Sequence, residues 1–282
     1  MPVFRHKKEL NSLLQEKKSK DLTIGLVPTM GALHQGHLSL VQKAIAENNT
    51  VVVSVFVNPT QFDNESDLDQ YPRNLDADVA LLHDISENII VFAPSREAIY
   101  SGEIKSKAYN FEGLEKVMEG TFRSGHFDGV ATIVELLFKA VQPDRAYFGE
   151  KDFQQLQIIK RLVNQKNIPV EIIPCPILRE KNGLAMSSRN ERLPKSVRND
   201  AGFIYEVLQT AKTKFGTKSA KNIKDWVADQ FDKSKLFKLE YFEIADVETL
   251  TPMLKKQKHQ KYRAFIAVYA NDIRLIDNIA LN

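Results

Sequence analysis

Short apolar runs alternate with segments of helical period along residues 22–175, and this alternation restricts the possible folds more than any other feature of the sequence. The runs are Leu22–Val27, Val51–Val57, Ile89–Phe92, Arg145–Phe148 and Val170–Ile173. Mostly apolar runs of this length are typical of strands buried on both faces of a parallel sheet. Parallel neighbours need a helical crossover between them, so the alternation predicts a Rossmann-like, doubly wound α/β fold.

The segments between these runs carry helical patterns. Helical spacing of apolar residues is found in His37–Ala46, Leu75–Leu82, Val130–Val141 and Asp152–Val163. In the first of them Leu38, Val41 and Ile45 share one helical face, and the third forms a continuous apolar stripe. We expect these helices to cover the predicted sheet.

The order of elements changes after Arg189. Two helical stretches, Ser196–Phe215 and Ser219–Phe231, are followed by strand-like runs at Leu239–Ala245 and Ala264–Tyr269. Helices followed by strands predict a smaller α+β domain. We therefore predict two domains, residues 1–176 and residues 177–282.

Composition narrows the class of protein. The 39 basic and 36 acidic residues leave a net charge of +3, which gives no reason to expect nucleic acid as a partner. The single cysteine, Cys175, excludes an intrachain disulfide and fits a reducing compartment; at a predicted strand end we expect it to be an inert core residue. No apolar stretch is long enough for a membrane span, and Met1–Lys20 lacks the apolar core of a signal peptide. We expect a cytoplasmic protein without membrane contact.

The first of four polar, glycine-bearing segments follows the first predicted strand. It consists of Pro28, Thr29, Met30, Gly31, Ala32, Leu33, His34, Gln35, Gly36 and His37. Its glycines let a ligand approach the backbone closely, and the helix that begins here presents free N–H groups, which bind phosphate. His34 and His37 lie within one helical turn, so both can point at that anion. Taken alone, the two histidines would equally suit a metal pair or an ordinary surface.

The other three segments also carry polar groups near strand ends. Asn58 and Gln61 offer amides suited to a small hydroxy acid, although a plain turn at Asn58-Pro59 explains them as well. The third segment, Phe148–Leu156, either places a lysine where it can pair with phosphate or is a solvated charged loop. Its candidate residues are Gly149, Glu150, Lys151, Asp152 and Gln155. The fourth segment, Gly183–Asn190, is either an anion-binding loop or a serine turn that caps the next helix. Its candidate residues are Met186, Ser187, Ser188 and Arg189.

Ligands bind at the carboxyl ends of the strands of an open parallel sheet, so we treat the four segments as one site. Two histidines, a lysine and a Ser-Ser-Arg loop can surround a polyphosphate, while the amides hold a small molecule at the reacting end. Neither a placed cysteine nucleophile nor a Ser-His-Asp order is evident. The set suits attack on a phosphate, which needs positioning and charge neutralisation more than covalent catalysis.

These segments, in this order, resemble the signature segments of the pantothenate synthetase (pantoate–β-alanine ligase) family. Tyr71-Pro72-Arg73 and the loop at residues 122–130 resemble two further segments, and the similarity spans nearly the whole chain, weakening after about residue 195. The resemblance implies an ATP-dependent ligase. Such an enzyme makes pantoyl-adenylate and pyrophosphate from pantoate and ATP, and then pantothenate and AMP with β-alanine.

The resemblance also implies roles for individual residues. Nucleotide-binding positions correspond to Met30–His37, Gly149–Asp152, Leu178 and Met186–Arg189, with His37 at the catalytic position and Leu178 at a backbone contact to adenine. Gln61 and Gln155 correspond to the glutamines that hold pantoate, Gln61 also lying near the β-alanine position, and we add Asn58 and Pro28 to the substrate-binding set. Charge that develops on the phosphates would be stabilised by His34, His37, Lys151, Ser187, Ser188 and Arg189.

Further expectations come from the resemblance alone. They are a homodimer formed through the first domain, magnesium carried on ATP, and a magnesium-linked acid at Asp78; other metal ligands are unassigned. On this basis residues 1–176 bind nucleotide and pantoate, and residues 177–282 form a C-terminal lid domain.

Two other classes of protein stay open at this point. A nucleotidylyltransferase needs a similar histidine turn and hydroxyl–arginine loop, and its product would be a pyrophosphate-linked nucleotide instead of an amide and AMP. An RNA-handling protein could use the lysines at positions 255, 256, 258 and 261, which also suit a solvated face. Retention on nucleic acid at modest salt would identify the latter.

Overall fold

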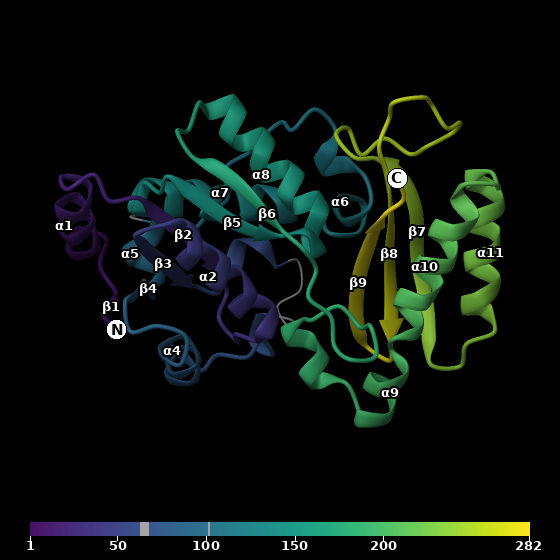
Figure 1. The fold of residues 1–282 in the computed structure, drawn as a ribbon, viewed down its shortest axis with the longest axis horizontal. Helices are drawn as coiled ribbons and strands as arrows, with labels where there is room; N and C mark the ends of the chain where they lie inside the picture. Colours follow the sequence, from purple (N-terminus) through teal and green to yellow (C-terminus); the bar gives the residue numbers. More distant parts are fainter. Residues whose placement is uncertain (63–67, 101) are drawn as a thin grey trace. The chain divides into compact units, whose positions relative to one another are not determined.

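The chain divides into two compact units. A computed structural model describes residues 1–62, 68–100 and 102–282. The first unit comprises Met1–Glu150 and Gln155–Pro176, and the second comprises Lys151–Gln154 and Ile177–Asn282. Figure 1 follows the chain through both units from its N-terminus to its C-terminus.

The first unit is built on a six-stranded sheet in the order β1-β4-β3-β2-β5-β6, in which every neighbouring pair is parallel (Figure 1). Its strands are β1 (Val3–Phe4), β2 (Ile24–Thr29), β3 (Thr50–Val55), β4 (Ile89–Phe92), β5 (Arg145–Gly149) and β6 (Glu171–Cys175). The predicted doubly wound parallel sheet is thereby confirmed. The chain runs from β2 to β3 and β4 on one side and places β5 and β6 on the other, so the strand order reverses between β2 and β5. This switch point is where open α/β sheets bind their ligands.

Helices flank this sheet (Figure 1). The helices described between β1 and β6 are α1 (Lys7–Lys18), α2 (Gln35–Glu47), α4 (Leu75–His83), α5 (Arg96–Tyr100), α6 (Glu119–Phe122), α7 (His126–Val141) and α8 (Phe153–Lys166), with 3-10 turns η1 (Pro59–Gln61), η2 (Leu114–Lys116) and η3 (Glu150–Asp152). Helix α2 contacts β2, β3 and β5. There Val27, Val41 and Val53 are fully buried in one core cluster. The apolar residues that predicted strands and helices are those that join the two layers.

The second unit is a three-stranded antiparallel sheet with helices packed against it (Figure 1). Its elements are η4 (Ser188–Arg192), α9 (Lys195–Asp200), α10 (Phe203–Phe215), α11 (Ala220–Asp232), β7 (Phe237–Asp246), β8 (Tyr262–Ala270) and β9 (Ile273–Ala280). Helix α11 contacts β7, and α10 contacts β8 and β9. Residues of these helices and strands share a separate apolar core, which includes Leu208, Val227 and Ile266.

One predicted element of the second unit was wrong in its extent. The single helix expected over Ser196–Phe215 is two helices, because the chain breaks at Ala201-Gly202. A Cβ added to Gly202 would lie 2.1 Å from the carbonyl oxygen of Asn182, so this close approach requires glycine. Within the described ranges, no helix is both long enough and apolar enough to cross a membrane.

Candidate functional site

The turn between β2 and α2, residues Met30–His34, has an unusual backbone at the sheet's switch point. Gly31 has φ +80° and Ala32 has φ +50°, which is the left-handed region that side chains disfavour. A Cβ on Gly31 would meet Asp78 Oδ2 at 2.8 Å and Val55 Cγ1 at 3.0 Å. A strained conformation of this kind persists only where the surrounding structure holds it, and such turns cluster at functional sites.

Asp78 of α4 supplies that restraint. Its carboxylate is 3% exposed and accepts a hydrogen bond from the N–H of Ala32 at 3.0 Å and from that of Leu33 at 2.7 Å. Burial raises the pKa of Asp78, and the two N–H donors oppose that rise. Both oxygens thus hold the β2–α2 turn, and the magnesium link that the resemblance suggested for Asp78 stays a prediction. Among the residues that the structure describes, no group of three or more His, Cys, Asp or Glu side chains is placed to hold a metal ion.

His34 and His37 cap the first turn of α2. Nδ1 of His34 accepts from the N–H of Gly36 at 3.1 Å, and Nδ1 of His37 accepts from the N–H of His34 at 3.4 Å. The two rings are tilted against each other with their centroids 4.1 Å apart. Because Nδ1 is an acceptor in both rings, the neutral form of each carries its proton on Nε2. The helix start thus combines two imidazole donors with its own positive dipole, an arrangement that favours an anion.

The second predicted segment forms η1, which α7 supports. Asn58 is 1% exposed and Gln61 8% exposed. Asn58 Nδ2 donates to the carbonyl oxygen of Gly129 at 3.1 Å and to Gln61 Oε1 at 3.3 Å. A Cβ on Gly129 would lie 2.2 Å from the carbonyl oxygen of Thr60, so glycine is needed where α7 meets η1. The Asn58 side-chain amide therefore connects η1 to α7, so Asn58 is more than a turn residue.

Gln61 is fixed at its backbone and its side chain. His126 Nδ1 donates to the Gln61 carbonyl at 2.7 Å, and Arg123 donates to the same oxygen at 3.3 Å. The side-chain Nε2 of Gln61 lies 2.8 Å from Met30 Sδ. The second segment is thus brought to the β2–α2 turn, as the sequence predicted for one shared site.

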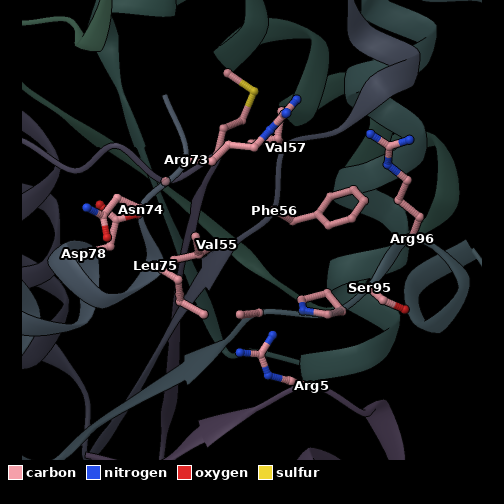
Figure 2. A pocket seen from close by; sticks show the side chains of 14 residues that line it. Arg5, Val55, Phe56, Val57, Arg73, Asn74, Leu75, Asp78, Ser95 and Arg96 are labelled. Carbon is pink, nitrogen blue, oxygen red and sulfur yellow. The ribbon is translucent and has the colours of Figure 1, made fainter. Parts of the chain in front are cut away.

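A cavity of about 340 Å³ adjoins the same turn at the carboxyl ends of β3 and β4. Met30, Gly31 and Phe56 line it, together with Arg5, Arg73 and Arg96. Figure 2 shows the three arginines coming from different segments around Phe56, with Asp78 beside Asn74. All three arginines are exposed, so this end of the sheet is open and carries positive charge.

The other predicted residues of the first unit lie on or after its central strands. Pro28 belongs to β2 and pairs in register with Ser54, while Gly149 ends β5 opposite Cys175. A Cβ on Gly149 would meet nothing within 4 Å, so the backbone there borders open space. Glu150 follows it, and Gln155 lies in the first turn of α8. Cys175 is buried, and burial raises the pKa of its thiol to about 11, which fits the predicted inert role.

The predicted residues of the second unit gather around a short hairpin. Leu178 and Met186 are joined by a hydrogen bond from the N–H of Met186 to the carbonyl of Leu178 at 3.0 Å. Ser187 caps η4, its Oγ accepting from the N–H of Arg189 at 3.3 Å, and Ser188 begins the turn. The serine turn considered as an alternative is therefore present, and the anion-binding role of the loop stays a prediction.

Strand β9, which the sequence did not predict, connects this hairpin to Lys151. Arg179 donates to both carboxylate oxygens of Asp277, at 2.6 and 2.9 Å, and its guanidinium lies 3.6 Å from the centre of the Tyr205 ring. Asn278 Nδ2 donates to the carbonyl of Lys151 at 2.8 Å. The side chain of Lys151 is 18% exposed and lies 3.4 Å from Asp152 Oδ1. Strand β9 thus binds the hairpin at Arg179 and the backbone at Lys151 through two neighbouring residues, Asp277 and Asn278.

Sequence reasoning missed the residues that hold the site. Asp78 lies 45 positions from Leu33, and Tyr100, which donates to Asn58 Oδ1 at 2.5 Å, lies 42 positions from Asn58. No spacing rule connects residues so far apart. His126 and Arg123 did stand in a loop that the resemblance singled out, but their contact with Gln61 is visible only in the folded chain.

A parallel sheet with a switch point, and a histidine-bearing turn with a helix start directly at that point, define a Rossmann-like α/β protein of the nucleotide-binding class. A sequence profile described as Pantoate-beta-alanine ligase matches residues 2–280. The chain therefore belongs to the pantoate–β-alanine ligase family.

Individual relatives agree with this assignment. The protein named pantothenate synthetase from Christiangramia forsetii is 58% identical over 282 residues, covering all of both chains. A crystal structure with a similar fold is that of pantothenate synthetase from Thermus thermophilus, with a TM-score of 0.91, 38% identity and coverage of 100% of this chain and 99% of that one. Another is that of the pantoate–β-alanine ligase from Francisella tularensis, complexed with beta-gamma ATP and β-alanine, with a TM-score of 0.80, 34% identity and coverage of 100% of this chain and 98% of that one.

Proposed function

We propose that this chain joins pantoate to β-alanine at the expense of ATP, releasing AMP and pyrophosphate through a pantoyl-adenylate intermediate. The observation that carries the proposal is the β2–α2 turn, where His34, His37 and a helix start lie next to Gln61 and Met30. Membership of the ligase family along residues 2–280 supports it. So does the Francisella relative, whose crystal structure is a complex with beta-gamma ATP and β-alanine.

In the first step a carboxylate oxygen of pantoate attacks the α-phosphorus of ATP, and the bond from that phosphorus to the bridging oxygen breaks. Negative charge grows on the departing pyrophosphate. We assign its stabilisation to the Nε2–H groups of His34 and His37 and to the N–H groups at the start of α2. A preorganised donor of this kind contributes about 3–4 kcal/mol to lowering a barrier. Their value here comes from being fixed by backbone hydrogen bonds before the nucleotide arrives.

The family resemblance also suggests phosphate contacts from residues of the second unit. We assign phosphate contacts to Lys151 and to Ser187, Ser188 and Arg189, and nucleotide contacts to Asp152, Leu178 and Met186. Lysine and arginine are the usual phosphate-binding cations, and the arginine fork can bind two oxygens at once. The hairpin contact between Leu178 and Met186 and the η4 cap at Ser187 support this assignment, because they preorganise the loop. Glu150 and Gly149, at the end of β5, complete the proposed nucleotide set.

In the second step the amine of β-alanine attacks the acyl carbon of pantoyl-adenylate. A C–N bond forms, the C–O bond to the phosphate breaks, and AMP leaves while the amine proton passes to a base or water. We assign pantoate binding to Gln61, Gln155, Asn58 and Pro28. Amide groups suit this substrate because they can both donate to its carboxylate and accept from its hydroxyls.

Three wider features complete the proposal. Magnesium enters as MgATP, since Mg²⁺ is usually held by substrate phosphates with one or two carboxylates and not by a protein cage. The enzyme acts as a homodimer in the cytoplasm, where a single buried thiol such as Cys175 stays reduced. Residues 1–176 and 177–282 are the functional domains, the first for nucleotide and pantoate.

Product analysis tests the proposed reaction. The purified chain is incubated with ATP, magnesium, pantoate and β-alanine, and AMP, pyrophosphate and pantothenate are quantified by chromatography and mass spectrometry. We expect the three products in equal amounts, and pantothenate only when all substrates are present. Pyrophosphate accompanied by a nucleotide-linked product, with no AMP, would instead identify a nucleotidylyltransferase.

A further inference from the structure

The buried side chain of Asn58 is held at both ends, by half-buried Thr60 and Tyr100 at its oxygen and by buried Gly129 and Gln61 at its nitrogen. Its Oδ1 accepts from the Tyr100 hydroxyl at 2.5 Å, from the Thr60 hydroxyl at 3.2 Å and from the Thr60 N–H at 3.4 Å. Its Nδ2 donates to the Gly129 carbonyl and to Gln61 Oε1. With 1% of the residue exposed, water does not compete for these contacts. Asn58 therefore connects α5, η1 and α7 in one network.

This network determines which way the Asn58 amide faces. The Gly129 carbonyl can only accept, so the nitrogen of the amide must face it and the oxygen must face Tyr100 and Thr60. A reversed amide would place oxygen against oxygen at Gly129 and leave a buried group unsatisfied, which is costly. The donor end of Asn58 is consequently presented to Gln61.

The orientation of the Asn58 amide also fixes the orientation of the Gln61 side-chain amide. Because Gln61 Oε1 accepts from Asn58 Nδ2, its other end, Nε2, is directed to the side of Met30, where Sδ lies 2.8 Å away. A flipped Gln61 would set two NH₂ groups against each other. The Gln61 amide, which the proposed function assigns to pantoate, thus offers a donor. The direction of this donor is set by Tyr100 through Asn58.

Tyr100 is suited to be the first donor in this series of hydrogen bonds, which leads through Asn58 to Gln61. It is the last residue of α5, half-buried, and its hydroxyl contacts both Asn58 and Thr60. Burial raises the pKa of Tyr100, and the bonds to Thr60 and Asn58 oppose that rise. The phenol stays protonated at neutral pH and remains a donor to Asn58.

We propose that Tyr100 is a positioning residue for pantoate, which acts through Asn58 to hold the Gln61 Nε2 donor toward the substrate. The inference rests on the proposed function, since it requires Gln61 to bind pantoate. It predicts that Tyr100 affects pantoate and leaves ATP unaffected, because the nucleotide groups at His34 and His37 are fixed by separate backbone hydrogen bonds.

The test is the substitution Tyr100→Phe in the full-length chain. It removes one hydroxyl and keeps the ring, whose centroid lies 6.4 Å from that of the Phe56 ring. We expect the KM for pantoate to rise about five- to tenfold, the effect of one lost hydrogen bond, with the KM for ATP unchanged. An unchanged pantoate KM, or equal rises for both substrates, would overturn the inference.

Tyr147→Phe is the matched control. Tyr147 is fully buried, and its hydroxyl donates to Glu47 Oε2 at 2.8 Å and accepts from Asn48 Nδ2 at 2.7 Å, away from the β2–α2 turn. The Tyr147→Phe variant also loses the hydrogen bonds of one tyrosine hydroxyl, so both variants should have a similarly lowered melting temperature. Only Tyr100→Phe should change the KM for pantoate. A pantoate effect of equal size in Tyr147→Phe would mean that general loosening, and not positioning, is responsible.

A double-mutant cycle with Asn58→Ala tests the route. If Tyr100 acts through Asn58, adding Tyr100→Phe to Asn58→Ala should leave the pantoate KM within about twofold of the single Asn58 variant. Multiplying effects would overturn the route, and so would a Tyr100→Phe chain that no longer unfolds cooperatively, since Tyr100 would then serve the fold alone. The wild-type chain distinguishes failure of the proposed function from failure of the Tyr100 inference. If the wild-type chain makes no pantothenate, the proposed function fails whatever the variants do.

Discussion

Replacing Asp78 by asparagine tests what holds the β2–α2 turn. Asparagine keeps one oxygen acceptor but sets an NH₂ group against the second backbone N–H, so one of the two bonds at 3.0 and 2.7 Å is lost. A hydrogen bond to a charged group contributes about 1.5–3 kcal/mol. Burial of the Asp78 carboxylate, which raises its pKa, is relieved by the neutral amide and offsets part of this loss. We therefore expect a net loss of about 1–2 kcal/mol of stability, seen as a melting temperature lower by about 2–6 °C.

The functional effect should exceed the effect on stability. Gly31 and Ala32 hold left-handed conformations that relax once a restraint is lost, and His34 follows closely in the chain. Because a displacement of about 1 Å at a catalytic group lowers rates by about a hundredfold, we expect pantoate-dependent pyrophosphate release at saturating ATP to fall about 10- to 100-fold. Stopped-flow detection of pyrophosphate gives this rate.

Asp76→Asn is the control for this experiment. Asp76 lies in the same first turn of α4 and is exposed, so its substitution makes the same change of charge without touching the β2–α2 turn. We expect near-normal stability and activity. Adenylation by Asp78→Asn within about threefold of wild type, or an equal loss in Asp76→Asn, would refute the role of Asp78 as the anchor.

Three more substitutions probe separate parts of the account. His37→Ala should lower single-turnover adenylation about a hundredfold or more with the fold intact by circular dichroism; near-normal adenylation would remove its assigned role. Gln155→Ala should raise the pantoate KM about tenfold with the ATP KM unchanged, and equal losses in steady-state assays for both substrates would contradict the pantoate assignment. Glu135→Gln concerns acid stability: burial raises the pKa of Glu135, but bonds from Lys139, Tyr109 and Lys107 outweigh it and hold the pKa at about 2, below its ordinary 4.5. A lowered folded pKa stabilises the chain above pH 4.5 and loses this effect as pH falls toward 2. Urea titrations should therefore show wild type losing roughly 2–3 kcal/mol across that window and Glu135→Gln losing much less; equal pH slopes would show that the network contributes nothing.

The parallel sheet could be predicted because burial on both faces leaves a strong apolar signal. Ile89–Phe92 has the predicted bounds as β4, and the run at Val51–Val57 contains most of β3, which ends at Val55 before Asn58 begins to cap η1. Strand β9 was missed because Asp277 and Asn278 interrupt its apolar pattern, and the structure shows why they are there: they bind Arg179 and the Lys151 backbone. Long-range contacts, which the local sequence pattern does not reveal, determine where β3 ends and why β9 carries polar residues.

The candidate site residues could be picked out from the sequence by their residue types. The residues that hold them in place could not. Histidines at a helix start and amides after a strand are visible in the sequence as residue types suited to anions and to small polar molecules. The restraints from Asp78, Tyr100 and His126 act across long separations, and only the folded chain reveals which backbone or amide group each one contacts. Nor could the sequence pattern indicate that both Nδ1 atoms of the histidine pair accept backbone hydrogen bonds.

Exchange of labelled pyrophosphate into ATP, measured without β-alanine, tests most directly the claim that the β2–α2 turn activates pantoate as an adenylate. The account predicts that exchange depends on pantoate, proceeds without β-alanine, and is lost in His37→Ala. Exchange that requires β-alanine, or that persists at the wild-type rate in His37→Ala, would contradict it.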